Sequence, residues 1–264
     1  MTYEYILVEQ RDRVGVITFN QPDRLNVFSY DMFGEVRQAI ETFNEDSSVG
    51  AVLLTGSGRA FCAGADLRGW NSEIEARERS GQRRRPREEA ENWVHFIQRS
   101  KPVICAINGL SIGVGLTMTL PCDVRIASER ARLSMRFVRV GVLPELASTR
   151  ILVQIVGLTQ AMELMLSGRI IDAAEAGRVG LVNRVVPEDE LMEHALDTAA
   201  EIAFNPAESL ATIKRFVWDH LAETELKEVL KRENAEFAAA MDRPAFKEAV
   251  SAFLDKRRPD FHRV

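Results

Sequence analysis

The chain has 264 residues, of which 46% are hydrophobic and 28% charged, and its formal net charge is −5. This composition is typical of a globular protein, so it excludes wholesale disorder and argues against binding to nucleic acid through bulk charge. Cys62, Cys105 and Cys122 are odd in number and lack C-x-x-C spacing, so the sequence indicates neither a disulfide framework nor a cysteine-rich zinc site. The first residues lack the basic and apolar regions of a signal peptide, and we therefore expect a cytoplasmic location.

The predicted elements alternate between strands and helices over the first part of the chain. Residues 6–8 and 14–19 are expected to be strands around a polar turn, and apolar residues from Met32 to Phe43 follow helical spacing. Three further apolar runs, at 49–55, 103–107 and 124–127, lack polar alternation and predict strands covered on both faces. Strands that alternate with helices indicate an α/β core.

The stretch 71–99 is polar and contains a cluster of arginines at 83–87. We expect a solvated helix–loop–helix excursion here. The alternative hypotheses are a mobile flap over a site or a basic patch for an anionic ligand.

The apolar stretch 103–127 is nearly long enough to span a bilayer. It also contains Asn108, Pro121, Asp123 and Arg125, which would be costly in lipid. We therefore expect a buried strand–loop–helix–strand and no membrane segment.

The pattern becomes helical after Pro187. Four successive helices are predicted, at residues 188–204, 207–221, 225–240 and 244–254. A helical tail that cannot cover its own apolar face commonly packs on a neighbouring chain. We accordingly divide the chain into a core at residues 1–195 and a C-terminal helical oligomerisation region at residues 196–264.

Two glycine-containing turns follow apolar strands, at residues 61–67 and 108–115. Small residues let the backbone approach a ligand, and the first N–H groups of a helix are free to donate hydrogen bonds. Two such donors that converge on one point would form an oxyanion hole. Either turn alone is weak evidence, because glycines after strands more often only make tight connections.

The second turn also satisfies G-x-S-x-G, a pattern typical of a nucleophile elbow, with Ser111 as the nucleophile. Asp172 or Asp189 with His194 or His220 would complete a triad in the chain order of such hydrolases. However, both histidines lie in predicted helices. The alternative hypothesis is that Ser111 is a small residue that permits close packing. No group of His, Asp and Glu has metal-ligand spacing, so no metal is implied.

Glu145 is a single acid in an otherwise apolar neighbourhood, residues 133–155. Burial disfavours the charged form of a carboxyl group and suits it to proton transfer near neutrality. The alternative hypothesis is a residue in the first turn of a helix that interacts with the helix dipole.

Together these motifs resemble the crotonase family, also called the enoyl-CoA hydratase/isomerase superfamily. The likeness covers nearly the whole chain, and several motifs in the right order are more specific than any one of them. They stand at residues 20–26, 61–67, 108–115, 121–123, 141–145, 164–168, 175–182 and 252–257. The resemblance implies an α/β fold, a crotonase-like spiral of ββα units with a C-terminal helical trimerisation region. It also implies a homotrimer or a dimer of trimers.

The same resemblance implies an acyl-CoA thioester as substrate, with coenzyme A as part of the substrate and no further cofactor. The thioester oxygen would accept hydrogen bonds from the backbone N–H groups of Ala65 and Val114. Phe253 and Lys256 would reach the coenzyme A of a neighbouring subunit. The residues implied in binding coenzyme A are Arg24, Ala63, Asp66, Leu67, Arg68, Phe253 and Lys256.

The acid–base residues distinguish members of this family. Typical hydratases carry two glutamates, at positions that Thr117 and Phe137 occupy here, whereas Glu145 matches the single catalytic glutamate of Δ3,Δ2-enoyl-CoA isomerases. Our leading hypothesis is an isomerase that converts 3-enoyl-CoA to 2-enoyl-CoA with Glu145 as acid and base. The alternatives are a hydratase, dehydratase or acyl-CoA hydrolase that uses Glu145 and a water, and an acyl-CoA-binding protein without turnover.

The acyl group is not fixed by the motifs. Trp70, Trp93 and Phe96 border or lie in the polar stretch 71–99, and they would favour a bulky or aromatic acyl chain if they lined its pocket. The alternative hypothesis for these three residues is ordinary core packing.

Overall fold

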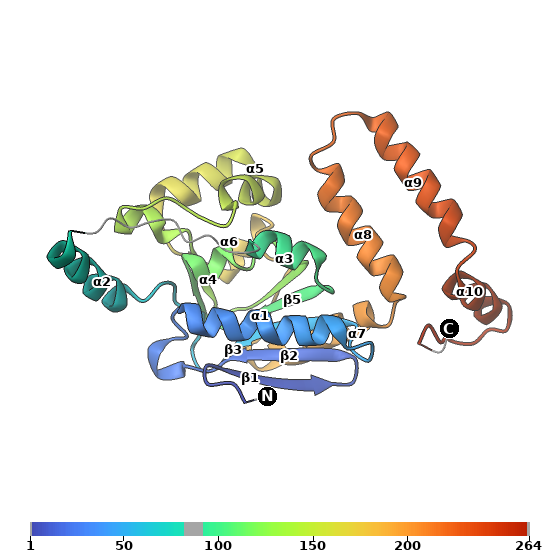
Figure 1. Cartoon of the computed structure of the whole chain (residues 1–264), viewed down its shortest axis with the longest axis horizontal. Helices are drawn as coiled ribbons and strands as arrows, with labels where there is room; N and C mark the ends of the chain where they lie inside the picture. Colours follow the sequence, from blue (N-terminus) through green and yellow to red (C-terminus); the bar gives the residue numbers. More distant parts are fainter. Residues whose placement is uncertain (1, 82–91, 263–264) are drawn as a thin grey trace.

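A computed structural model of the chain describes residues 2–81 and 92–262, and the side chains of Arg68 and Glu73 lie outside the described part. The predicted arginine cluster at 83–87 also lies outside it. The strands form two sheets, and the chain adds strands to the two sheets in alternation from β3 to β8 (Figure 1).

The larger sheet has six strands in the order β1-β2-β3-β5-β7-β10. Its strands are β1 (Ile6–Arg11), β2 (Val14–Phe19), β3 (Ala51–Gly56), β5 (Val103–Ile107), β7 (Val124–Ser128) and β10 (Arg184–Val186). β1 is antiparallel to β2, and every later neighbour is parallel. The three predicted central strands are confirmed within a residue or two of their expected ends.

The smaller sheet has the order β4-β6-β8-β9. Its strands are β4 (Ala60–Cys62), β6 (Leu110–Ile112), β8 (Arg132–Ser134) and β9 (Ile171–Asp172). Each central strand of the larger sheet is followed by one strand of the smaller sheet. The helices α2 (Leu67–Ser80), α4 (Val114–Thr117) and α5 (Ser148–Ser167) come after these pairs. The repeated strand–strand–helix unit is the predicted spiral. Because β4, β6 and β8 are parallel neighbours, the segments that follow them leave the smaller sheet at one edge.

The larger sheet is buried on both faces, as its uninterrupted apolar runs predict. Leu54 and Cys105 belong to one hydrophobic cluster, whereas their neighbours Leu53 and Ile104 belong to a second. The second cluster is completed by α7 (Leu191–Ala203), through its small residues Ala195, Ala199 and Ala203. The predicted division after residue 195 therefore falls inside a helix that packs on the sheet.

Helix α1 (Tyr30–Glu45) covers the other face of the larger sheet near its N-terminal edge (Figure 1). It begins at Ser29, whose side chain accepts a hydrogen bond from the Met32 N–H at 3.2 Å, which satisfies one of the unpaired donors of the first turn. Its buried residues recur at three- and four-residue intervals. They are Met32, Phe33, Val36, Ala39, Ile40 and Phe43.

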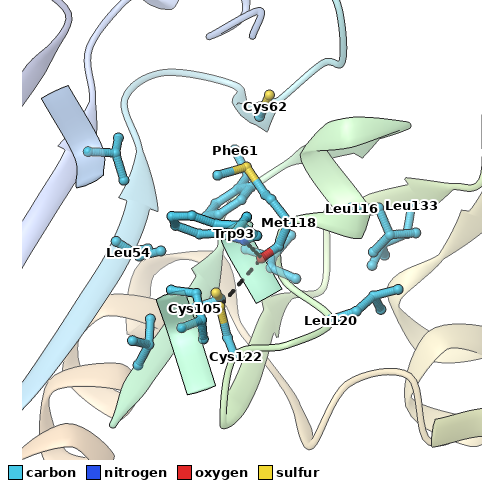
Figure 2. Packing of buried hydrophobic residues seen from close by; sticks show 14 of the residues in the cluster. Leu54, Phe61, Cys62, Trp93, Cys105, Leu116, Met118, Leu120, Cys122 and Leu133 are labelled. Carbon is cyan, nitrogen blue, oxygen red and sulfur yellow. Dashed lines mark hydrogen bonds between the residues drawn. The ribbon is translucent and has the colours of Figure 1, made fainter. Parts of the chain in front are cut away.

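The prediction for the polar stretch 71–99 is half right. Helix α2 (Leu67–Ser80) is mostly exposed, but α3 (Trp93–Arg99) belongs to the hydrophobic core. The indole of Trp93 is fully buried and donates a hydrogen bond to the Met118 carbonyl at 2.9 Å (Figure 2). The prediction of solvation fails for this helix because the average polarity of the long stretch conceals one apolar turn.

The stretch 103–127 folds as β5, β6, the short helix α4 (Val114–Thr117) and β7. This is the expected strand–loop–helix–strand. Within residues 2–81 and 92–262, no helix is long and apolar enough to cross a membrane.

The remaining helices are α5 (Ser148–Ser167), α6 (Ala173–Arg178), α8 (Ala207–His220), α9 (Leu226–Ala240) and α10 (Pro244–Leu254). Helix α8 is anchored to the core by Lys214, whose buried ammonium group donates to the Asp123 carboxylate at 2.7 Å.

Helices α9 and α10 stand apart from the sheets (Figure 1), and α9 has no buried residue. The tail presents a row of exposed apolar side chains: Ile213, Val217, Leu221, Leu226, Leu230, Phe237, Met241, Phe246, Val250, Phe253 and Leu254.

Candidate active site

The first glycine turn is held by backbone bonds on both sides. The Ala63 N–H donates to the Leu25 carbonyl at 3.0 Å, and the Phe28 N–H donates to the Gly64 carbonyl at 2.7 Å. Gly64 has φ +100°, and a Cβ atom there would lie 2.9 Å from the Ile112 carbonyl oxygen, so both the conformation and the space favour glycine. Neither of these two bonds uses the N–H of Ala65.

The second glycine turn leads into α4. Gly113, with φ 57° and ψ −121°, adopts a conformation that is essentially restricted to glycine, and its N–H donates to the Ser134 carbonyl at 2.9 Å. Val114 is the first helical residue, so its N–H has no acceptor within the helix. A Cβ atom on Gly115 would clash with the Cys62 carbonyl oxygen. The two predicted turns are therefore in backbone contact.

Both turns open into one cavity of about 1920 Å³. Ala63, Ala65, Asp66, Leu67 and Val114 line it together with Glu145. Its apolar wall is formed by Phe28, Trp70, Leu110, Ile112, Phe137, Val140, Val142, Leu143 and Ile170. A largely apolar cavity with a few convergent polar groups is the usual form of a small-molecule site.

Glu145 lies outside any helix, in the segment that precedes α5. Its backbone carbonyl accepts from the Ser148 N–H at 3.1 Å, and the next two residues, Leu146 and Ala147, have the left-handed φ of 54°. Two corrections follow. Glu145 is not a residue of the first helical turn, and its side chain is exposed to the open cavity instead of being buried in the apolar surroundings that the sequence predicts.

The Glu145 carboxylate is bonded to helix α4. The Thr117 hydroxyl donates to Glu145 Oε1 at 2.8 Å, and Thr117 itself is fully buried. Because Thr117 belongs to the same short helix as Val114, this bond ties the carboxylate to the second turn. The sequence marked Thr117 as a departure from the hydratase pattern, but residue spacing gave no signal of this contact.

Phe137 stands in the short helix Arg136–Val140 and lines the cavity. The ring Cζ lies 4.0 Å from the point where a Cβ atom of Gly113 would be. The two positions at which the resemblance implies glutamates in typical hydratases hold a hydroxyl and an apolar ring in this chain.

The residues expected to bind coenzyme A fall into three groups. Ala63, Asp66 and Leu67 line the cavity, and Arg24 reaches it through an ion pair in which its guanidinium lies 2.5 Å from the Asp66 carboxylate. The side chain of Arg68 lies outside the described residues. Phe253 and Lys256 do not line this cavity: Phe253 lies in the last turn of α10 and is 82% exposed.

Ser111 is not placed as a nucleophile. It is fully buried, and its hydroxyl donates to the Gly115 carbonyl at 2.9 Å. Of the candidate partners, His194 lies beside Glu190 on the outer side of α7, and the Asp172 side chain caps α6 by accepting from the Glu175 N–H. The hypothesis of a Ser111 triad is therefore wrong, and the packing hypothesis accounts for the residue.

Of the three aromatic residues considered for the acyl pocket, Trp70 lines the cavity. Trp93 and Phe96 lie in the hydrophobic core with exposures of 0% and 2%, so core packing is the correct interpretation for both. Across the described ranges, no group of three or more His, Cys, Asp or Glu side chains could hold a metal ion.

A family model described as enoyl-CoA hydratase/isomerase matches residues 9–263. The chain belongs to this family. It is 35% identical over 262 residues to the mitochondrial enoyl-CoA hydratase of Pongo abelii, a match that covers 98% of this chain and 88% of that protein. It is 32% identical over 264 residues to the 1,2-epoxyphenylacetyl-CoA isomerase of Escherichia coli, which covers 98% of each.

Solved structures of the enoyl-CoA hydratase/isomerase family share its fold. The enoyl-CoA hydratase of Bacillus anthracis superimposes with a TM-score of 0.86 at 30% identity, covering 97% of this chain and 98% of that one. The predicted crotonase-like α/β fold with C-terminal helices is thus confirmed.

Proposed function

We propose that this family member is an enoyl-CoA isomerase that moves the double bond of a 3-enoyl-CoA to give the conjugated 2-enoyl-CoA. The observation that carries the proposal is the position of Glu145. Its carboxylate is joined by Thr117 to the helix of the second turn, while Thr117 and Phe137 occupy the positions of the two hydratase glutamates. One carboxylate is enough to move a proton between two carbons.

In this proposal the thioester oxygen accepts hydrogen bonds from the N–H groups of Ala65 and Val114. As the C2–H bond breaks, its electron pair delocalises into the thioester and the double bond, and negative charge grows on that oxygen. Fixed backbone donors stabilise charge that develops in the transition state more than they stabilise the neutral substrate. Loss of one such donor costs roughly 3 kcal/mol in comparable sites.

Glu145 takes the proton from C2 as base and then returns it to C4 as acid. The C3–C4 double bond becomes a C2–C3 double bond, and the carboxylate ends in its starting state. The sum is neutral in protons and electrons, so the reaction calls for neither a redox cofactor nor a metal. Phe137 supports this outcome because an apolar ring beside Gly113 disfavours a water near the reacting carbons.

The coenzyme A portion would lie along Ala63, Asp66 and Leu67, with the exposed guanidinium of Arg24 toward the phosphates. The exposed apolar side chains of α8, α9 and α10 support a homotrimer or a dimer of trimers, in which Phe253 and Lys256 reach the coenzyme A of a neighbouring subunit. The C-terminal region thus acts in assembly. The expected cytoplasmic location and the absence of nucleic-acid binding stay predictions.

The direct test supplies a 3-enoyl-CoA and follows formation of the conjugated thioester by ultraviolet absorbance. The protein should convert it, and Glu145→Gln should lose most of the rate, because the amide cannot accept the C2 proton. If Glu145→Gln converts the substrate as fast as the unaltered protein, the assigned role is wrong.

The competing function is hydration of a 2-enoyl-CoA. It is favoured by the name of the Pongo abelii relative, an enoyl-CoA hydratase, and by the same name in relatives from Mycobacterium bovis and Rhizobium meliloti, whereas the Escherichia coli relative is named as an isomerase of 1,2-epoxyphenylacetyl-CoA. Hydration needs a positioned water and two proton transfers to different atoms. Incubation of a 2-enoyl-CoA in ¹⁸O-labelled water separates the two: ¹⁸O in a 3-hydroxyacyl product supports the hydratase, and formation of some 3-enoyl-CoA without ¹⁸O, by the reverse reaction, supports the isomerase.

A further inference from the structure

We propose that Thr117 is the positioning residue of Glu145: its hydroxyl holds the carboxylate in a fixed orientation toward the two oxyanion donors. The inference rests on the proposed function, because it assigns the feature that keeps the single acid–base group in place. It adds a residue whose contribution is a hydrogen bond to the base, without contact to the reacting carbons.

The geometry assigns the Thr117 proton to the carboxylate. The hydroxyl lies 2.8 Å from Glu145 Oε1 and 3.5 Å from the Val114 carbonyl oxygen. A hydroxyl has one proton to donate, and an O–H···O bond is normally 2.5 to 3.0 Å long. The shorter contact is therefore the hydrogen bond, and Thr117 is fully buried, so solvent does not compete for its proton.

A hydrogen bond of this kind restricts a carboxylate that stands in irregular backbone. It lies in an irregular segment before α5, and its side chain is exposed to the cavity. A glutamate side chain in such a place has three rotatable bonds and loses much freedom when it is fixed. A reacting group displaced by as little as 1 Å loses on the order of 100-fold in rate.

The anchor also fixes the base relative to the oxyanion site. Thr117 and Val114 are the last and first residues of α4, and the Thr117 N–H donates to the Gly113 carbonyl at 3.0 Å. The hydroxyl that holds Glu145 and the N–H that would hold the thioester oxygen therefore belong to one rigid helical turn. The distance between base and oxyanion does not then depend on the irregular segment alone.

The test compares four variants with the unaltered protein: Thr117→Val, Thr117→Ser, Thr117→Ala and Thr119→Val. Thr119 is the matched control, since it is equally buried and its hydroxyl donates to the Leu116 carbonyl at 2.8 Å. Two rates are measured. One is isomerisation of a 3-enoyl-CoA, and the other is exchange of the C2 protons of a saturated acyl-CoA in D₂O, which needs the base without a double bond.

Thr117→Val should lower kcat on the order of 10- to 100-fold while KM changes by less than about threefold. The variant misplaces the base but leaves the contacts that bind the substrate unchanged. Thr117→Ser should recover most of the rate, and Thr119→Val should keep it. In a Glu145→Gln background, Thr117→Val should have no further effect, since the two residues act as a unit.

The inference is overturned if Thr117→Val keeps the original kcat. If that variant fails to fold, Thr117→Ser and Thr117→Ala decide, and equal losses in both overturn it. If the unaltered protein exchanges the C2 protons but does not isomerise the substrate, the proposed isomerase function is refuted. The exchange rates of the variants would still show whether Thr117 positions Glu145. Absence of both reactions would refute the isomerase and the positioning role together.

Discussion

The backbone of Gly115 packs so closely on the carbonyl oxygen of Cys62 that a Cβ atom has no room between them. Gly115 follows Val114 at the start of α4, and Cys62 ends β4, just before the first turn. This contact brings two segments more than fifty residues apart into register. The proposed oxyanion site depends on it, because both donors come from backbone held by the two segments.

Substitution Gly115→Ala should separate the two turns. Overpacking a filled interior typically costs about 1–3 kcal/mol, and the displaced turn should also lower kcat. Thermal unfolding and the isomerase assay measure both effects. The control is Gly34→Ala in α1, where a Cβ atom meets nothing within 4 Å and a gain of roughly 0.5–1 kcal/mol is expected. An active and stable Gly115→Ala protein would contradict the proposed geometry.

Removal of the cation at the mouth of the cavity should weaken binding of coenzyme A esters. Arg24→Ala is expected to raise KM about tenfold, equivalent to ~1.4 kcal/mol, with a smaller effect on kcat. The KM of the unaltered protein should rise with salt, because exposed charges are screened. Arg11→Ala is the control, since Arg11 is an exposed cation that pairs with Glu9 in β1. Equal KM values in both variants would refute the role of Arg24.

The apolar side chains of α9 should be buried in an oligomer. Leu230→Glu with Phe237→Glu is expected to shift the protein toward monomer in size-exclusion chromatography with light scattering, because each introduced charge would be desolvated at the contact. Lys227→Glu on the same helix is the control and should assemble normally. An unaltered protein that is already monomeric would rule out the proposed assembly.

The cysteines should be unreactive in the folded protein. Burial raises the pKa of the Cys62 thiol to about 12, and burial together with its neighbour Cys122 raises that of Cys105 well above its ordinary value. Because the thiolate is the reactive form, and because Cys122 is buried from the reagent, a thiol reagent at pH 8 should label none of the three until denaturant is added. An added surface cysteine, Ala222→Cys, should be labelled at once. Rapid labelling of the unaltered protein would contradict the observed packing.

Much of the fold is predictable because it is local. The apolar run at 103–107 and the three- and four-residue spacing in α1 reflect burial within one element, and the helices after Pro187 begin and end near their predicted residues. The error at α3 has a physical reason. Trp93 and its neighbours form one apolar turn inside a polar stretch, and the average composition conceals it.

The sequence predicts the motifs that form the candidate site, but it does not predict the contacts between their side chains. The turns around Gly64 and Gly113 carry their conformational requirement in the sequence, since both have positive φ. The hydrogen bond from Thr117 to Glu145 joins residues 28 positions apart, and spacing along the chain contains no information about it. The exposure of Glu145 depends on an open cavity that forms only after the sheets assemble.

The central claim is that Glu145 moves a proton between C2 and C4 of an enoyl-CoA. The most direct measurement is the rate of conjugated thioester formation from a 3-enoyl-CoA, compared between the unaltered protein and Glu145→Gln. We predict rapid conversion by the former and a loss of at least ~100-fold in the latter, the lower range for a general acid–base group. Equal rates in the two proteins, or no conversion by either, would contradict the claim.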